Sequence, residues 1–233
     1  MPAVDFVFPP PACPAVPVAG NTRHYPVGRV FCVGRNYAAH AREMGFAPDR
    51  EQPFYFTKAP AAVVASGDTV DYPPGTNDFH HEVELVVAIG APVFEITAAT
   101  ALDSVFGYAC GLDMTRRDLQ RAARSKRYPW DISKDVEAGA VVGPIRPVTD
   151  CGHPRSARIR LAVNGDTRQD SNITAMIWPV ADIVAHLSHF YHLVPGDLIF
   201  TGTPEGVGPV EAGDTLSGSI DGVGDVELHI AAA

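Results

Sequence analysis

The stretch HHEVELVVAIG, residues 80–90, decides the fold class. Side chains alternate along a strand with a period of two, so Glu82 and Glu84 would share one face, followed there by small apolar side chains. The opposite face is apolar throughout. A strand that is apolar on both faces belongs in the middle of a sheet. The segment therefore predicts a core strand with two carboxylates at one end.

Further β-type runs lie on both sides of this segment, separated by many of the 21 glycines and 21 prolines. The expected strands span 30–33, 54–57, 82–89, 105–112, 140–145, 158–163, 198–201, 215–220 and 226–230. The pair Asn164-Gly165 predicts a hairpin after the run 158–163. Helices are expected at 37–44, 118–124 and 180–190, the last begun by Pro179 and amphipathic. The pattern predicts an α+β fold that is predominantly β.

The 233 residues are enough for one sizeable domain. Residues 1–28 are rich in proline and lack hydrophobic periodicity, with six prolines between Pro2 and Pro17. This composition predicts an extended arm that lies on the domain surface or is disordered. A single domain is expected over 29–233.

Charge and composition exclude several classes of protein. The formal charge of −9, from 18 basic and 27 acidic side chains, argues against a nucleic-acid partner. The longest apolar stretch, 85–94, is too short to span a bilayer and is broken by Gly90 and Pro92. No basic residue precedes Arg23, which is unlike a signal peptide. We expect a cytoplasmic protein whose widely spaced cysteines are reduced: Cys13, Cys32, Cys110 and Cys151.

Three acidic residues form a candidate metal site. Glu82 and Glu84 would lie roughly 7 Å apart by Cα on a buried face, where they repel each other unless a cation neutralises them. An isolated Glu-x-Glu is more simply a strand end that emerges into water. The third acid, Asp113, ends the apolar run 105–112 at a comparable position. Three oxygen ligands without cysteine favour Mg²⁺, Mn²⁺ or Ca²⁺ over zinc.

A second candidate pair is His40 and Glu43, which lie three residues apart on a short expected helix and can share a hydrogen bond. Such a pair can act as a general base, in which the imidazole takes a proton from water and the carboxylate orients the ring. A solvated helix surface explains the same spacing more simply. Lys58, at the end of the run PFYFTK, could face the pocket, but a lysine at a strand end is more simply interpreted as solvated.

Six features in this order resemble the fumarylacetoacetate hydrolase family. They are VGRNYAAHAREMG (33–45), PFYFTK (53–58), HHEVELVVAIG (80–90), GYACGLDMTRRDLQ (107–120), Lys134 and IFTGTPEGVG (199–208). Within the family the motifs look most like those of the fumarylpyruvate and acylpyruvate hydrolases. The resemblance covers nearly all of the chain beyond the arm. It implies a mixed β-sheet roll with a few peripheral helices, usually a homodimer.

The resemblance also implies roles for individual residues. Glu82, Glu84 and Asp113 match the ligands of Mg²⁺ or Mn²⁺, and His40 with Glu43 matches the catalytic dyad. Lys134 matches a lysine that approaches the reacting carbonyl. The positions that match substrate contacts are Arg117, Gln120 and Thr203. Relatives tend to follow the lysine with Ser or Gly, Phe and Asp, whereas this chain reads KDVEAG over 134–139, a departure that bears on the packing of the lysine and on the pocket wall nearby.

The activity implied by the resemblance is metal-dependent hydrolysis of the C–C bond of a 2,4-diketo acid. Fumarylpyruvate, cleaved to fumarate and pyruvate in aromatic degradation through gentisate, is the leading substrate. An isomerase or decarboxylase of 2-keto acids, of the oxaloacetate or hydroxymuconate type, is the nearest alternative on the same fold. A non-catalytic, metal-stabilised protein is the third reading. The His40 and Glu43 pair favours hydrolysis, because the alternatives need no group that activates water.

Basic residues concentrate directly after Asp113. They are Arg116, Arg117, Arg121, Arg124, Lys126 and Arg127, six of the 18 basic side chains. Helical spacing places Arg117, Arg121 and Arg124 on one side. A cationic wall beside the metal site would favour a substrate with a second carboxylate, which fumarylpyruvate has and acetylpyruvate lacks.

Overall fold

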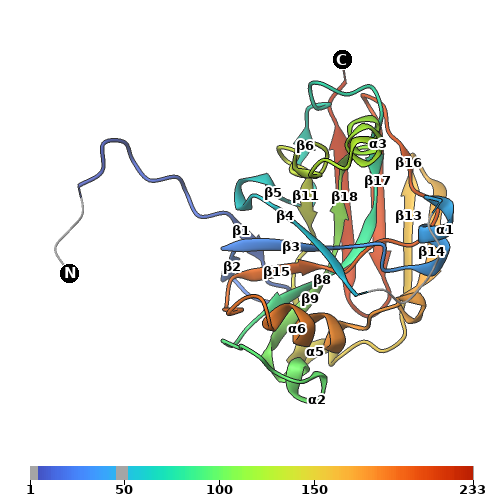
Figure 1. Cartoon of the computed structure of the whole chain (residues 1–233). Coiled ribbons are helices and arrows are strands. Elements are labelled where there is room, and N and C mark those ends of the chain that lie inside the picture. Colours follow the sequence, from blue (N-terminus) through green and yellow to red (C-terminus); the bar gives the residue numbers. More distant parts are fainter. Residues whose placement is uncertain (1–4, 46–51, 233) are drawn as a thin grey trace.

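The structure is a computed structural model that describes residues 5–45 and 52–232 (Figure 1). Its strands are β1 (Ala15–Pro17), β2 (His24–Pro26), β3 (Arg29–Gly34), β4 (Phe54–Lys58), β5 (Val63–Ala65), β6 (Thr69–Val70), β7 (Phe79–His81), β8 (Val83–Ile89), β9 (Val105–Asp113), β10 (Thr115–Arg116), β11 (Ala140–Val142), β12 (Arg146–Pro147), β13 (Arg158–Val163), β14 (Asp166–Asn172), β15 (Asp197–Phe200), β16 (Gly208–Pro209), β17 (Thr215–Ile220) and β18 (Gly224–Ile230). Its helices are α1 (Ala38–Glu43), α2 (Ala98–Ala101), α3 (Arg117–Lys126), α4 (Asp131–Lys134), α5 (Val148–Cys151) and α6 (Val180–Ser188).

Two sheets form the body of the molecule. The larger has the order β4-β3-β15-β8-β9-β11-β5, with β12 also paired to β9. The second has the order β14-β13-β17-β18-β6. The pairs β3 with β15, β5 with β11 and β6 with β18 are parallel, and the other pairs in these two sheets are antiparallel. The α+β, predominantly β fold that the sequence predicts is confirmed.

Strand β8 lies at the centre of the larger sheet and is buried along its whole length. Its face with Val83 and Leu85 packs against the second sheet and α6 in one hydrophobic core. Its face with Val86 and Ala88 packs in a separate core that includes side chains of the β1–β2 hairpin. The two apolar faces predicted from residues 80–90 therefore each meet a core.

The pairing of β8 with β9 brings the acidic ends of the two strands together. Glu84 lies opposite Gly111, and Asp113 N donates to Glu82 O at 2.9 Å. Gly111 has no room for a side chain, because a Cβ there would lie 2.6 Å from Val86 Cγ2 and 2.9 Å from Val141 O. The absence of a Cβ lets neighbouring strands pack closely beside the carboxylates.

The predicted helices are confirmed with changed ends: 37–44 corresponds to α1, 180–190 to α6, and 118–124 to α3, which starts one residue earlier and continues to Lys126. The Asn164-Gly165 hairpin is confirmed by β13 and β14, with positive φ at both turn residues. The strand expected over 140–145 ends at Val142. Pro144, two residues further on, has no backbone N–H to continue the ladder, and Gly143 packs against Asp225 O without room for a Cβ.

The Pro-rich segment predicted as an arm over 1–28 consists of two different parts. Residues 5–14 extend away from the body of the molecule (Figure 1), and nearly all of them are exposed. Residues 15–27 form the β1–β2 hairpin, in which Val16 and Tyr25 are buried. Tyr25 Oη donates to Ile89 O at 2.7 Å, which fixes the hairpin to the end of β8. The boundary at residue 28 therefore does not separate packed from unpacked chain.

Among the described residues, no helix is both long and apolar enough to cross a membrane. All four cysteines are free thiols, as the sequence predicts.

Gly111→Ala tests the close approach at the end of β9. The added methyl would overlap Val86 and Val141, so we expect a loss of about 1–3 kcal/mol in the free energy of unfolding. Gly28→Ala is the matched control, because a Cβ there meets nothing nearer than 3.7 Å. Urea unfolding measures both. Equal stability of the two variants would contradict the packing argument.

Candidate active site

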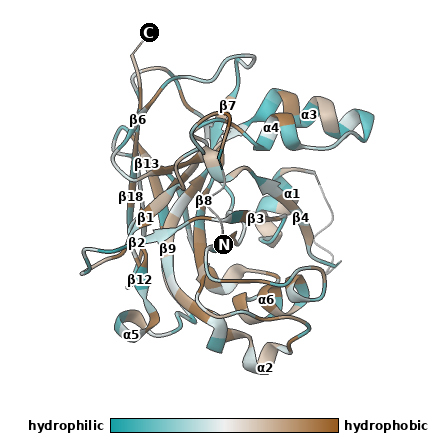
Figure 2. Cartoon of the chain, turned by 90° about the vertical axis from the view of Figure 1, so that its left-hand side faces the viewer, coloured by the Kyte–Doolittle hydropathy of each residue, from teal (hydrophilic) through white to brown (hydrophobic). Residues whose placement is uncertain are grey.

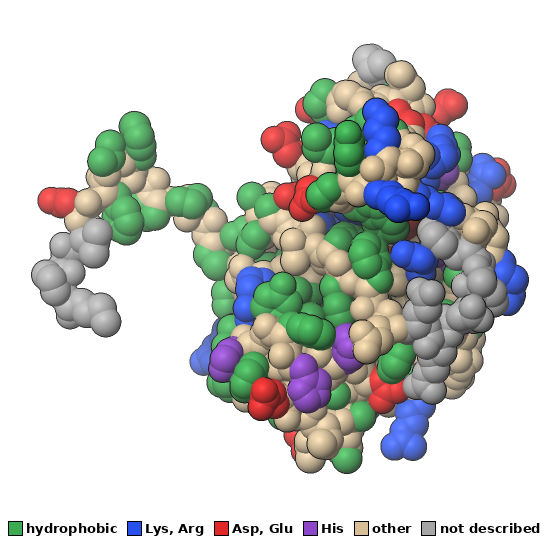
Figure 3. All heavy atoms as spheres, viewed as in Figure 1, with side chains coloured by type: hydrophobic (Ala, Val, Ile, Leu, Met, Phe, Trp, Pro, Cys, Tyr) green, Lys and Arg blue, Asp and Glu red, His purple; other side chains and the backbone are tan. Residues whose placement is uncertain are grey.

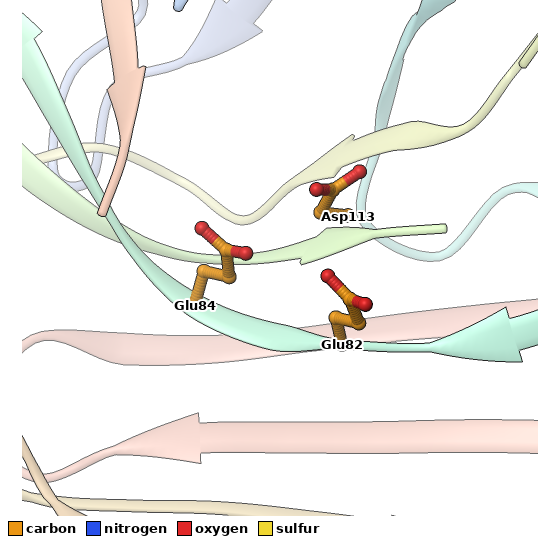
Figure 4. Close-up of side chains that lie close together, drawn as sticks. All are labelled: Glu82, Glu84 and Asp113. Carbon is orange, nitrogen blue, oxygen red and sulfur yellow. The ribbon is translucent and has the colours of Figure 1, made fainter. Parts of the chain in front are cut away.

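Glu82, Glu84 and Asp113 form a cluster of carboxylates at the rim of the larger sheet. Each offers one ligand oxygen, and the three oxygens lie within 4.8 Å of one another. Figure 4 shows the first two acids on one segment and Asp113 on the neighbouring strand, with the carboxylates facing a common space. Their exposed fractions are 4%, 2% and 0%. The sequence prediction that these acids come together is confirmed, and the alternative of a solvated strand end is wrong.

Three basic side chains neutralise two of these acids. Lys134 Nζ lies 2.7 Å from Glu82 Oε2 and 2.7 Å from Asp113 Oδ2. The other oxygen of Glu82 accepts a hydrogen bond from Arg117 Nη2. Lys58 Nζ lies 2.8 Å from Asp113 Oδ1. All three basic residues are at most 2% exposed, so these ion pairs are little screened by solvent.

The pKa values of Glu82 and Glu84 shift in opposite directions. Burial raises the pKa of Glu82, but Lys134 and Arg117 outweigh it and hold that pKa well below its usual range. Burial and repulsion from Asp113 and Glu82 raise the pKa of Glu84 well above its ordinary value. Its Oε2 accepts one hydrogen bond, from Gly202 N at 2.6 Å. Glu84 is therefore the carboxylate of the cluster that most needs an added proton or cation.

The cluster fits a hard divalent cation. All of its ligand atoms are carboxylate oxygens, which Mg²⁺ and Mn²⁺ prefer. Asp113 Oδ1 is buried and accepts no hydrogen bond within the described part of the chain, although Lys58 Nζ is near. Asp113 Oδ1 therefore has a lone pair available for a cation, and the raised pKa of Glu84 shows that a positive charge beside it would be favourable.

Helix α1 carries the predicted dyad. His40 Nδ1 lies 3.1 Å from Glu43 Oε2, and His40 is 7% exposed. Gly206 N donates to Glu43 Oε1 at 3.1 Å. The hydrogen bond from His40 and that from Gly206 together hold the pKa of Glu43 below its ordinary value, against the effect of burial. Glu43 thus stays ionised at neutral pH and can orient the imidazole. The spacing prediction is confirmed, and the solvated-surface interpretation is wrong for His40.

One pocket brings nearly all the predicted residues together. It is lined by Val33, Gly34, Arg35, His40, Met44, Phe56, Glu82, Glu84, Asp113, Arg117, Gln120, Arg121, Arg124, Trp130, Lys134 and Thr203. Glu43 is not part of this lining but is bonded to His40, which is. Helix α1 supplies His40 to the lining, and α3 and α4 supply Arg117 and Lys134, so helices far apart in the sequence contribute to one pocket. In Figure 2 these helices lie on the same side of the molecule.

The basic cluster contributes to this pocket as its helical spacing predicts. Arg117, Arg121 and Arg124 all line it, and Lys and Arg side chains gather over the region of α3 in Figure 3. Arg117 Nη1 donates to Gln120 Oε1, so its guanidinium is held between that amide and Glu82. Arg121 pairs with Asp78 and is more exposed. The two outer arginines therefore stand nearer to solvent than Arg117.

Lys58 is a site residue that the sequence allowed to face the pocket but did not single out, and its interpretation as solvated is wrong. It is 2% exposed, and besides contacting Asp113 its Nζ donates to the carbonyl oxygens of Met114, at 3.1 Å, and Lys134. Lys58 is the last residue of β4 and lies opposite Val30 of β3. The motif PFYFTK was the only signal that could have drawn attention to it.

The departure after Lys134 lies away from the pocket. Asp135 Oδ1 accepts a hydrogen bond from Ala59 N at 2.8 Å, and Val136 is fully buried in the larger core. Neither is among the described residues that line the pocket. Val136 therefore packs into the body of the protein, while Asp135 and Glu137 are exposed, and the pocket wall beside Lys134 is formed by other residues.

This combination of buried carboxylates, an ion-paired lysine and a histidine dyad in a β roll defines an enzyme site suited to a divalent cation and an activated water. Comparison with known families agrees. Residues 29–231 match the family described as fumarylacetoacetate (FAA) hydrolase, C-terminal. The chain belongs to the fumarylacetoacetate hydrolase family, and the predicted family-type roll is confirmed.

Individual relatives are similar over most of their length. Fumarylpyruvate hydrolase from a Ralstonia species is 52% identical over 183 residues, which are 78% of this chain and 95% of that protein. A mitochondrial oxaloacetate tautomerase from Arabidopsis thaliana is 37% identical over 202 residues, covering 87% and 90%. The crystal structure of fumarylpyruvate hydrolase from Pseudomonas aeruginosa in complex with Mn²⁺ and pyruvate is 49% identical, with a TM-score of 0.94 over 98% of this chain and 100% of that chain.

Lys58→Met tests the charge balance of the cluster. It would leave Asp113 Oδ1 buried without its nearby cation, so we expect metal-free protein to lose about 3–5 kcal/mol of unfolding free energy. Added Mn²⁺ should raise the melting temperature of Lys58→Met more than that of the wild type, because the cation replaces the lost charge.

Arg158→Met is the control, since it breaks the exposed Arg158–Asp170 pair and should change stability little. Thermal unfolding with and without Mn²⁺ measures each variant. A Lys58→Met protein as stable as the wild type would show that Lys58 does not compensate Asp113.

Proposed function

We propose that this chain hydrolyses the C–C bond of a 2,4-diketo acid, with fumarylpyruvate and water giving fumarate and pyruvate. The observation that carries the proposal is that His40, bonded to Glu43, lines the same pocket as the three carboxylates. Such a pair is suited to activating water, which hydrolysis needs. The 52% identity to a fumarylpyruvate hydrolase supports this choice of substrate. Aromatic degradation through gentisate is the proposed source of the substrate.

Glu82, Glu84 and Asp113 would hold Mg²⁺ or Mn²⁺. A divalent cation bound there would orient the 2-keto acid end of the substrate and offset the negative charge that develops on the pyruvyl half as the bond breaks. The similar structure of the Pseudomonas aeruginosa fumarylpyruvate hydrolase, in complex with Mn²⁺ and pyruvate, supports this assignment. Gly202 N–H keeps Glu84 pointing into the cluster.

The catalytic base is His40. Its Nδ1 faces Glu43, so Nε2 is the nitrogen that can take a proton from water. Glu43 fixes the ring and stabilises the imidazolium that forms. Because the pKa of Glu43 lies below its ordinary value, the carboxylate stays charged down to acidic pH.

Lys134 and the arginine wall serve the substrate. Lys134 Nζ lies at the edge of the carboxylate cluster, where it can stabilise the oxyanion formed when hydroxide adds to the far carbonyl. Arg117 and Gln120, bonded to each other, and Thr203 are the proposed substrate contacts. The departing pyruvyl carbanion then takes a proton to give pyruvate.

A 2-keto acid isomerase or decarboxylase is the alternative function. The 37% identity to an oxaloacetate tautomerase favours the isomerase form of it. The same purified protein can be given enol-oxaloacetate and fumarylpyruvate in parallel. Tautomerisation without cleavage of the diketo acid would assign the alternative.

We propose further that the protein is a cytoplasmic homodimer. Free thiols at all four cysteines fit a reducing compartment. Large apolar side chains that are exposed in the single chain include Phe54, Tyr128, Phe190 and Tyr191, which would be covered in a dimer. Sedimentation equilibrium distinguishes a dimer from a monomer.

His40→Ala tests the base. Loss of the imidazole should lower kcat for fumarylpyruvate about 10²–10⁴-fold, while Mn²⁺ affinity stays within about twofold because His40 is not a proposed ligand. The loss of the diketone enol absorbance gives the rate, and assays for pyruvate and fumarate identify the products. His189→Ala is the control, since His189 is exposed beyond α6. A His40→Ala enzyme with wild-type rate and pH profile would place the base elsewhere.

The arginine wall predicts a preference for a dicarboxylate. We expect kcat/KM for fumarylpyruvate to exceed that for acetylpyruvate by an amount equivalent to about 1.5–3 kcal/mol, the contribution of one charged hydrogen bond. Arg124→Met should reduce the difference, whereas Arg127→Met, beyond the pocket lining, should preserve it. Equal specificity constants for the two acids in the wild type would contradict the dicarboxylate proposal.

A further inference from the structure

Gln169 is a buried amide on an otherwise solvated strand. Within β14 it is fully buried, while its neighbours Arg168 and Asp170 are exposed. The pairing of β13 with β14 shifts here, because Leu161 pairs with Gln169 and Ala162 with Thr167. Arg168 is the extra residue of this bulge, and the bulge re-aims the next side chain into the protein. A polar group placed there must have its hydrogen bonds satisfied.

The hydrogen bonds of Gln169 define the orientation of its amide. Oε1 accepts from Val83 N at 3.0 Å, and a backbone N–H can only donate. Nε2 must then be the donor to Thr203 Oγ1 at 2.8 Å and to Pro204 O at 2.9 Å. His81 Nδ1 lies 3.1 Å from Oε1 and must donate to it, because an amide oxygen can only accept. The amide therefore joins the beginning of β8 to the loop 201–206.

The direction of the Thr203 hydroxyl follows from this orientation. Since Thr203 Oγ1 accepts from Gln169, its proton is free to point to Val83 O, 2.9 Å away. The Thr203 hydroxyl thus donates to the carbonyl oxygen of Val83, and the Gln169 amide accepts from the backbone N–H of the same valine. Thr203 is held on both sides before any substrate arrives.

The loop that Gln169 holds makes the two backbone contacts on which the site depends. Gly202 N donates to Glu84 Oε2 at 2.6 Å, and Gly206 N donates to Glu43 Oε1 at 3.1 Å. Gly206 has a φ of +89°, and a Cβ there would overlap Arg168 O. The loop therefore rests directly on the bulge that directs Gln169 inward, and it links a proposed metal ligand to the dyad.

We propose that Gln169 is a positioning residue for the active site: its Nε2 holds Thr203 and Pro204, so that the loop N–H groups face Glu84 and Glu43. The proposal rests on the proposed function. Gln169 touches neither substrate nor cation in it, and acts through the loop. An apolar side chain would fill the same space, but it would fix neither the direction of the Thr203 hydroxyl nor the position of the loop 201–206.

The test uses the whole enzyme and two variants that retain the size of the side chain. Gln169→Glu keeps an oxygen for Val83 N–H but presents a second oxygen to Pro204 O. Gln169→Met removes donor and acceptor together. Thr167→Val, on the exposed part of the same strand, is the matched control. Calorimetric titration gives the Mn²⁺ Kd, fumarylpyruvate kinetics at saturating Mn²⁺ give kcat and KM, and thermal unfolding gives the melting temperature.

For both Gln169 variants we expect Mn²⁺ Kd to rise about fivefold or more and kcat to fall about tenfold or more at temperatures where the protein is folded, with Thr167→Val within about twofold of the wild type. A purely structural role would lower the melting temperature and leave kcat and Kd of the folded protein unchanged, which would overturn the proposal. If Gln169→Glu is recovered only as aggregate, Gln169→Met gives the same decision.

A double-mutant cycle with Thr203→Val sharpens the test. If Gln169 acts through the threonine, its substitution costs less in the Thr203→Val background than in the wild type, by about threefold or more in kcat/KM. Independent, multiplicative effects would contradict the proposal. Should the wild type fail to cleave fumarylpyruvate, the proposed function falls, and the change in Mn²⁺ Kd still decides the role of Gln169.

Discussion

The mutual repulsion of three buried carboxylates is the constraint on which this structure depends. Each ion costs several kcal/mol to bury, and that cost is offset only by close partners of opposite charge or by strong hydrogen bonds. Lys134 contacts Glu82 and Asp113, and Lys58 lies beside Asp113. Glu84 has a backbone N–H in place of a basic partner. The uncompensated repulsion of the cluster thus falls mainly on Glu84, where a bound cation would offset it.

Much of the fold serves to hold this cluster in place. The β8–β9 register sets Glu82 beside Asp113, and Gly111 lets the sheet close around them. The end of β4 directs Lys58 into the cluster, and α4 does the same for Lys134. On the open side, the loop 201–206 reaches both the carboxylates and α1. A site that needs rigid geometry for chemistry is therefore built on strand ends and one short, doubly anchored loop.

Features with a local signal could be predicted from the sequence. The alternation over 80–90 gave the buried strand and the shared face of Glu82 and Glu84, and the spacing of His40 and Glu43 gave the dyad. The roles of Lys134 and Thr203 came only from resemblance. Nothing local distinguishes them from any lysine or loop threonine, because their importance depends on contacts with residues far away in the sequence.

Lys58 and Gln169 show why other parts of the site could not be predicted from the sequence. A lysine at a strand end is solvated unless another strand end carries an acid beside it, and that depends on which strands pair. Gln169 lies in the polar strand DTRQDSN, whose pattern indicates an exposed edge. Its burial results from a bulge at Arg168, which no periodicity reveals. In both cases tertiary pairing overrides the local pattern.

Titration of Mn²⁺ into metal-free wild type and Glu84→Gln is the most direct test of the central claim. Glutamine keeps the size of the side chain and an oxygen for Gly202 N–H, but it removes the charge that the cation would neutralise. We predict one Mn²⁺ per chain in the wild type and a Kd about tenfold or more higher in Glu84→Gln. An unchanged Kd in the variant, or no binding to the wild type, would contradict a carboxylate cluster built to hold a cation.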